Sequence, residues 1–83
     1  MRITLKLFAT LSRHLPAAAR RNEAVLTVEQ GTTVGRLLDE LAIPRAEVHI
    51  ALVNGRHVDV EALDSASLAE GDTLALWPPV GGG

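Results

Sequence analysis

The residues best suited to chemistry lie at the end of the sequence, where Pro-Pro-Val leads into three glycines at 78–83. A C-terminal carboxylate has a pKa of about 3.5, so at neutral pH it is an anion and a poor electrophile. Activation as an acyl phosphate would remove that obstacle. Glycines carry no side chains, so such a tail can enter a narrow channel and adopt any backbone angle. We therefore expect Gly83 to be the reactive residue.

The prolines before the glycines fit the same interpretation. Ordering a flexible tail costs about 1–2 kcal/mol per residue, and two prolines favour a stiff, extended stem that reduces this cost. The alternative is a glycine-rich end without a role. The residues expected to present the reactive carboxylate are Pro78, Pro79, Val80, Gly81 and Gly82.

Composition excludes several classes of function. The chain has 83 residues, 47% of them apolar, which suits one packed domain. It contains no cysteine, so a disulfide framework, a thiolate zinc site and a cysteine nucleophile are excluded. His14, His49 and His57 lack metal-ligand spacing, and we expect no metal site.

Charge and hydropathy indicate where the protein works. The net charge is -2 without a basic cluster, which argues against nucleic-acid binding. No apolar run approaches the roughly 20 residues that span a bilayer, and the alternating start does not resemble a signal peptide. We therefore expect a cytoplasmic protein without a membrane partner.

Hydrophobic periodicity predicts the elements that must position the tail. Period-two alternation or short apolar runs predict strands at 2–8, 24–29, 48–53, 57–60 and 73–77. Asn54-Gly55 predicts a hairpin turn, because both residues tolerate positive φ. An apolar stripe predicts a helix over 34–41, capped by Thr32 or Thr33 and ended by Pro44. A short helical turn is expected at 9–15, and a short irregular or 3₁₀ segment at 63–68.

This element order predicts an α+β domain. A single amphipathic helix can cover only one face of a sheet, so a mixed sheet of four or five strands packed on that helix is the economical arrangement. We expect the domain to span 1–77 and the tail to project from it at 78–83.

The chain resembles the β-grasp, ubiquitin-like sulfur carriers of the MoaD/ThiS family. The resemblance rests on LFATLSRHL at 7–15, TTVGRLLDEL at 32–41, VNGRHV at 53–58 and LAEGDTLALWPPVGGG at 68–83. It implies that a ubiquitin-activating-type enzyme uses ATP to adenylate Gly83. Sulfur from a donor protein then gives a thiocarboxylate, which a synthase large subunit or equivalent accepts. The carrier would be a cosubstrate, not a catalyst, with no permanently bound cofactor.

Within this resemblance several roles stay open. The Pro-Pro-Val stem and the LFATL segment look like the molybdopterin synthase small subunit, which is the role we favour. Carriers for thiamin, cysteine or another metabolite share the pattern, and a ubiquitin-like modifier would join the same activated glycine to a lysine. A β-grasp binding module would not need the terminal glycines.

Trp77 is the candidate centre of a partner interface. If Leu74 and Leu76 face the helix, Trp77 faces the open side of the sheet, and tryptophan is over-represented at interface hot spots. The alternative is that Trp77 covers the edge of the core. The residues expected to form this interface are Trp77, Ala75, Val53, Ala51 and Arg56.

Overall fold

The computed structural model describes residues 1–17 and 19–79. Val80 and the glycines at 81–83, which carry the tail prediction, lie outside the described residues. The predicted strand alternation is confirmed in β1 (Arg2–Leu7), where Ile3, Leu5 and Leu7 are buried and the intervening side chains are not. This alternation makes one face of the sheet the core face.

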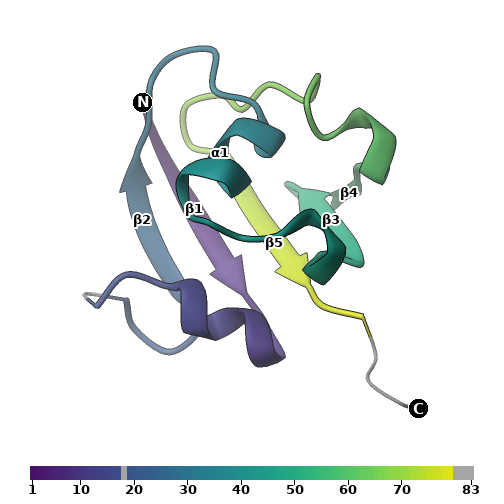
Figure 1. The fold of residues 1–83 in the computed structure, drawn as a ribbon. Helices are drawn as coiled ribbons and strands as arrows, with labels where there is room; N and C mark the ends of the chain where they lie inside the picture. Colours follow the sequence, from purple (N-terminus) through teal and green to yellow (C-terminus); the bar gives the residue numbers. More distant parts are fainter. Residues whose placement is uncertain (18, 80–83) are drawn as a thin grey trace.

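The sheet is mixed and has five strands, as predicted. Its order is β2-β1-β5-β3-β4 (Figure 1), so the first and last strands of the chain lie at its centre. β1 pairs in parallel with β5 (Thr73–Trp77), and the other neighbours are antiparallel: β2 (Glu23–Thr27), β3 (Ile50–Val53) and β4 (Arg56–His57). The last strand of the chain, β5, is therefore paired on both sides.

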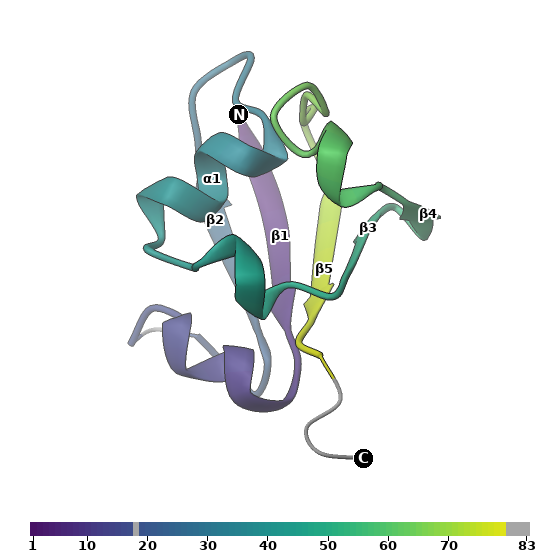
Figure 2. The same ribbon diagram turned by 45° about the vertical axis from the view of Figure 1, so that its right-hand side comes forward.

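The helix α1 (Val34–Glu40) lies on one face of this sheet, as Figures 1 and 2 both show. Its first four N–H groups all have acceptors. The Thr33 hydroxyl accepts a hydrogen bond from Arg36 N, and the Thr33 carbonyl accepts one from Leu37 N, which confirms a threonine cap. The carbonyls of Leu63 and Ala66 accept from the first two helical residues. The segment after β4 thus supplies acceptors for the N–H groups at the beginning of the helix.

The helix ends one turn before Pro44, so the prediction that this proline stops it is wrong. Ala42 adopts a left-handed φ of 57°, and Ile43 N donates to Leu38 O at 2.9 Å. Ala42 N also donates to Asp39 O at 3.1 Å. These two bonds form a Schellman motif, which satisfies the last carbonyls without proline.

The described part of the chain also contains three 3₁₀ helices: η1 (Ala9–His14), η2 (Arg45–Glu47) and η3 (Val60–Ala62). The predicted turn at 9–15 is confirmed as η1. The segment 63–68, predicted to be irregular or 3₁₀, is irregular, and η3 lies entirely before it. The third and fourth strands are shorter than predicted, because η2 precedes one and η3 follows the other. β5 has the predicted bounds.

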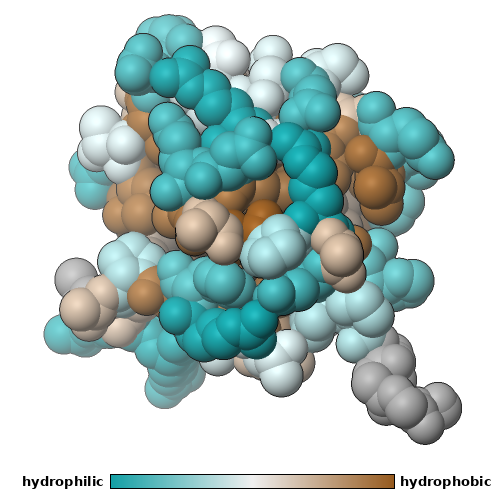
Figure 3. Space-filling model, in the orientation of Figure 1, coloured by the Kyte–Doolittle hydropathy of each residue, from teal (hydrophilic) through white to brown (hydrophobic). Residues whose placement is uncertain are grey.

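The core lies between the sheet and α1. Leu37 and Leu38 of the helix are buried against the core side chains of the central strands, including Leu5, Leu74 and Leu76. Seen from the helix side (Figure 3), hydrophilic side chains cover much of the surface and apolar ones show in a band across its middle. Among the described residues, no helix or strand covers the opposite side of the sheet, which we call the open face. None of the helices in the described residues has the length and apolar character needed to cross a membrane.

Candidate functional site

The end of β5 fixes the root of the tail. Trp77 O accepts a hydrogen bond from His49 N at 2.8 Å, and Leu76 O accepts one from Phe8 N at 3.1 Å. Pro78 is half-buried and Pro79 is exposed. The backbone is therefore anchored on both sides up to Trp77, which precedes Gly83 by six positions.

Trp77 is half-buried and stacks on Phe8. The two rings are parallel, at an interplanar angle of 1°, with their centroids 4.3 Å apart. Phe8 directly follows β1 and continues its alternation on the face of Thr4 and Lys6. The aromatic pair consequently marks the open face at the end of the sheet from which the tail leaves.

Two further apolar side chains extend this aromatic pair. Residues paired across antiparallel strands point to the same face. Ile50 lies opposite Trp77, and Leu52 lies opposite Ala75. Both β3 residues are only half-buried. The open face therefore carries an apolar patch, which we call the aromatic patch, made of Phe8, Ile50, Leu52, Ala75 and Trp77.

The predicted patch of Trp77 with Ala51 and Val53 is wrong. Ala51 pairs with Leu76 and is 2% exposed, and Val53 pairs with Leu74 and packs against the core. Both therefore face the helix. The sequence 48–53 is apolar on both faces, so its composition does not show which residues point inward. Ala75 does share the open face with Trp77, as predicted.

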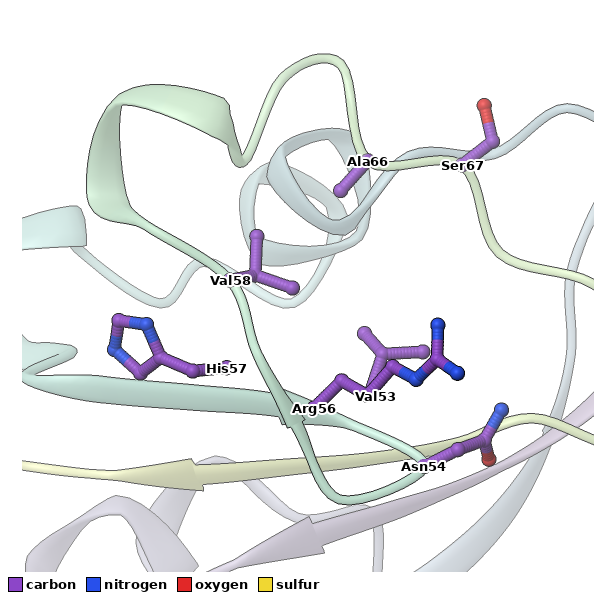
Figure 4. A pocket seen from close by; sticks show the side chains of 7 residues that line it. All are labelled: Val53, Asn54, Arg56, His57, Val58, Ala66 and Ser67. Carbon is purple, nitrogen blue, oxygen red and sulfur yellow. The ribbon is translucent and has the colours of Figure 1, made fainter.

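Arg56 also lies away from Trp77. It pairs with Val53, which places it on the helix side of the hairpin. In Figure 4 its side chain lies beside Val53 and below Ala66 and Ser67. These residues line a hollow of about 630 Å³. The three steps of β3 from Ile50 to Val53 also separate it from Trp77 by about 10 Å. A partner on the aromatic patch and one on Arg56 would thus approach different sides.

The turn at the far end of the sheet is locked by side-chain hydrogen bonds. Asn54 and Gly55 have φ values of 52° and 81°, confirming the predicted hairpin turn. Asn54 Nδ2 donates to Asp72 Oδ1 at 2.8 Å, and Asn54 Oδ1 accepts from Thr73 N at 2.9 Å. These bonds join the β3–β4 hairpin to the start of β5, so the strand that leads into the tail is fixed at its beginning as well.

Ion pairs fix the surroundings of the sheet end. Glu47 of η2 contacts Arg13 at 2.5 Å and His14 at 3.3 Å, both in η1. On the helix side, Arg45 bridges Asp39 and Asp64, and its hydrogen bond to Asp64 raises the pKa of the guanidinium.

Among the described residues, no group of three or more His, Cys, Asp or Glu side chains is placed to hold a metal ion.

Sequence reasoning missed Phe8, Ile50 and Leu52. The signal for Phe8 was present, because it continues the alternation of Thr4 and Lys6. The two β3 residues could not be assigned from their own segment. Their face depends on the pairing of Ile50 with Trp77, which are 27 positions apart in the chain, and on the register of β5.

The chain is similar to proteins of one family. Residues 5–83 match the ThiS family. The crystal structure of SAMP1 (small archaeal modifier protein 1) from Haloferax volcanii has 30% identity to this chain and a TM-score of 0.70, with all of both chains covered. The thiamine biosynthesis protein ThiS from Geobacter metallireducens has 22% identity and a TM-score of 0.66, again over both full chains.

A further solved structure has the same fold. It is the complex of subunits 1 and 2 of the molybdopterin-converting factor from Helicobacter pylori, with 18% identity, a TM-score of 0.61 and full coverage of both chains. No curated protein matches the chain. Because the family match extends over nearly the whole sequence, the protein belongs to the ThiS family, within the ubiquitin-like sulfur carriers and small protein modifiers of β-grasp fold.

Proposed function

We propose that the protein is a sulfur carrier whose Gly83 carboxylate is adenylated and then converted to a thiocarboxylate. The observation that carries the proposal is the family match, which runs from residue 5 through the terminal glycines to residue 83. The geometry of the described residues supports it, because the central strand β5 ends where the tail begins. ATP would be bound by the activating enzyme, and the carrier itself would hold no cofactor.

The aromatic patch is the proposed docking surface for the activating enzyme and the sulfur-accepting synthase. It lies beside the root of the tail, so a partner that covers Trp77 would receive the glycines in its active site. Half-exposed aromatic and aliphatic side chains next to one another are typical of interface hot spots. Arg56, on the other side of the hairpin, would contact only a partner that extends around the edge of β4.

Shortening or lengthening the tail tests the proposal. We expect removal of Gly83, or addition of one residue after it, to abolish ATP–pyrophosphate exchange with a ubiquitin-activating-type enzyme. The terminal carboxyl carbon then falls short of the bound ATP in the first variant and extends past it in the second. Both variants should keep the circular dichroism spectrum and melting temperature of the native chain, since the tail follows the last strand. Undiminished exchange in either variant, or unfolding of the shortened chain, would contradict this account.

For the sulfur acceptor, we propose molybdopterin synthesis. The chain has the fold of the small-subunit proteins, and the H. pylori structure is itself a complex of subunits 1 and 2. By analogy, the large subunit of a molybdopterin synthase would cover the aromatic patch. Thiocarboxylated protein should then convert the synthase substrate to molybdopterin with that subunit. Sulfur transfer only to a thiazole-forming enzyme would assign the protein to thiamin synthesis instead.

A second function, covalent modification of other proteins, is favoured by the likeness to SAMP1, which has 30% identity over both full chains. It would use the same adenylate, attacked by a lysine amine in place of sulfur. ATP-dependent isopeptide links between Gly83 and other proteins, formed without a sulfur donor, would support this function.

A further inference from the structure

Lys6 is the only lysine of the chain; seven arginines carry the remaining positive side-chain charge. The other amine, at Met1, donates a hydrogen bond to Val28 O at 2.7 Å and is partly buried at the edge of the sheet. This hydrogen bond and the partial burial hinder attack by the Met1 amine on an acyl group. Lys6 carries the only side-chain amine of the chain, so it is the side chain that can be acylated.

Lys6 lies on the open face. It belongs to β1 and is paired with Glu23 on one side and with Ala75 of the aromatic patch on the other. Phe8, which stacks on Trp77, follows two residues later on the same face. The side chain is half-buried and forms no ion pair with the described residues. A long amphipathic side chain in this position packs its stem on the apolar patch and leaves its amine in solvent.

We propose that Lys6 is the self-conjugation site of the protein, accepting the activated Gly83 acyl group of a second copy. This rests on the proposed function, because the acyl adenylate is its source in the cell. The unprotonated amine attacks the Gly83 carbonyl carbon, a C–N bond forms, and the bond to the phosphate oxygen breaks. AMP leaves with the electron pair and the amine loses one proton, giving an isopeptide-linked dimer.

The linkage would block docking on the acceptor copy. A second copy attached at Lys6 lies beside Ala75 and Phe8, on the surface proposed for docking. The acceptor copy would keep a free Gly83 carboxylate that an activating enzyme can no longer approach. Conversely, a partner bound to the aromatic patch covers the Lys6 amine and prevents the reaction. Docking and self-conjugation would therefore exclude each other.

An enzyme-free reaction tests the acceptor site independently of adenylation. The full chain is prepared with a Gly83 thioester, incubated at mildly alkaline pH and analysed by intact mass and peptide mapping. We expect a dimer linked from Gly83 to Lys6, and a loss of about tenfold or more in the Lys6→Arg variant, because guanidinium is not nucleophilic. Added Nα-acetyl-lysine amide, which should be acylated, verifies that the thioester is reactive.

Three results would overturn the proposal. These are a link at the Met1 amine, an equal yield of dimer in Lys6→Arg, and hydrolysis alone when the added lysine derivative is acylated. None of them bears on the proposed function, which would fail only if the native chain cannot be adenylated or thiocarboxylated.

A matched dimer tests the exclusion. In the double variant Lys6→Arg/Arg36→Lys the only lysine lies on α1, on the helix side of the sheet, at a position that is exposed. Each dimer is compared with its own monomer in ATP–pyrophosphate exchange, counted per free Gly83. We expect the exchange rate of the dimer linked at Lys6 to be about tenfold or more below that of its monomer. The exchange rate of the dimer linked at position 36 should stay within about twofold of that of its monomer. Equal exchange by both dimers would overturn the exclusion, whereas inactive monomers would contradict the proposed function itself.

Discussion

At the scale of single residues, Trp77 joins the fold to the proposed function. Its ring stacks on Phe8, and its carbonyl binds His49 N, so both neighbouring strands position it. It is only half-buried, in contrast to Leu76 before it, which is completely buried. Trp77 is thus the last residue with a fixed side chain on a sheet strand before the tail, and it faces the side of the sheet that no helix covers.

This position predicts how Trp77→Ala behaves. Loss of the aromatic stack should lower the free energy of unfolding by about 1 kcal/mol. Loss of a hot spot should weaken binding to the activating enzyme by 2 kcal/mol or more, about 30-fold in Kd. Denaturant unfolding and titration calorimetry measure the two effects.

Val25→Ala is the matched control. Val25 is 56% exposed on the open face, but lies on the edge strand β2, away from the tail. Val25→Ala should weaken binding to the activating enzyme by less than about 1 kcal/mol. A large stability loss in Trp77→Ala with unchanged binding would show that Trp77 belongs to the core edge and not to an interface.

Asn54 is a structural residue with two separable contributions. Its φ of 52° favours asparagine or glycine, and its side chain binds Asp72 and Thr73. Asn54→Ala should lower stability by about 2 kcal/mol, since it loses both contributions. Asn54→Gly keeps the backbone conformation and should lose only about half as much. Equal losses in thermal unfolding of the two variants would show that the left-handed backbone contributes nothing.

At the scale of elements, the limits of sequence reasoning are clearest in β3. The alternation of β1 and β5 correctly predicted which leucines are buried, because each strand has one apolar and one mixed face. β3 is apolar on both faces, so the inward position of Ala51 is set by pairing with Leu76, not by its own sequence. Local patterns therefore predicted the elements and most of the core, whereas the make-up of the interface depends on contacts between distant segments.

The end of α1 is a second case in which a local signal was misread. Proline is a known helix terminator, so the sequence predicted a helix end at Pro44. The left-handed backbone of Ala42 could not be predicted, because alanine rarely adopts it. A glycine there would have been recognised as a helix C-terminus. The helix actually ends because Ile43 is buried at 2% exposure, and the Schellman turn directs it into the core.

Ala42→Gly should stabilise the protein. Relief of left-handed strain, about 1–2 kcal/mol, exceeds the additional backbone entropy that glycine loses on folding, about 0.5–1 kcal/mol. We expect a net gain of about 0.5–1 kcal/mol in chemical denaturation. Ala46→Gly, at an exposed residue of η2 without positive φ, should instead be destabilising by up to about 1 kcal/mol. A loss of stability in Ala42→Gly would refute the proposed strain.

At the scale of the whole molecule, the fold separates stability from chemistry. Leucine, isoleucine and valine between α1 and the sheet form the core, and β5, which leads into the tail, is held between β1 and β3. In the proposed function, the open face is left for a partner, and the reactive group is a main-chain carboxylate instead of a side chain. Such a division would explain why a protein that another enzyme activates needs no arrangement of catalytic side chains of its own.

Intact mass of the native-ended protein tests this account most directly. The chain is incubated with ATP, an adenylating enzyme of the ubiquitin-activating type and a sulfur donor, and the product is mapped by fragmentation. The account predicts a mass increase equal to one sulfur replacing one oxygen, located at Gly83, and none in a chain extended by one residue. If several adenylating enzymes give neither this product nor an ATP-dependent conjugate, the carrier account is contradicted and the protein is a binding module centred on Trp77.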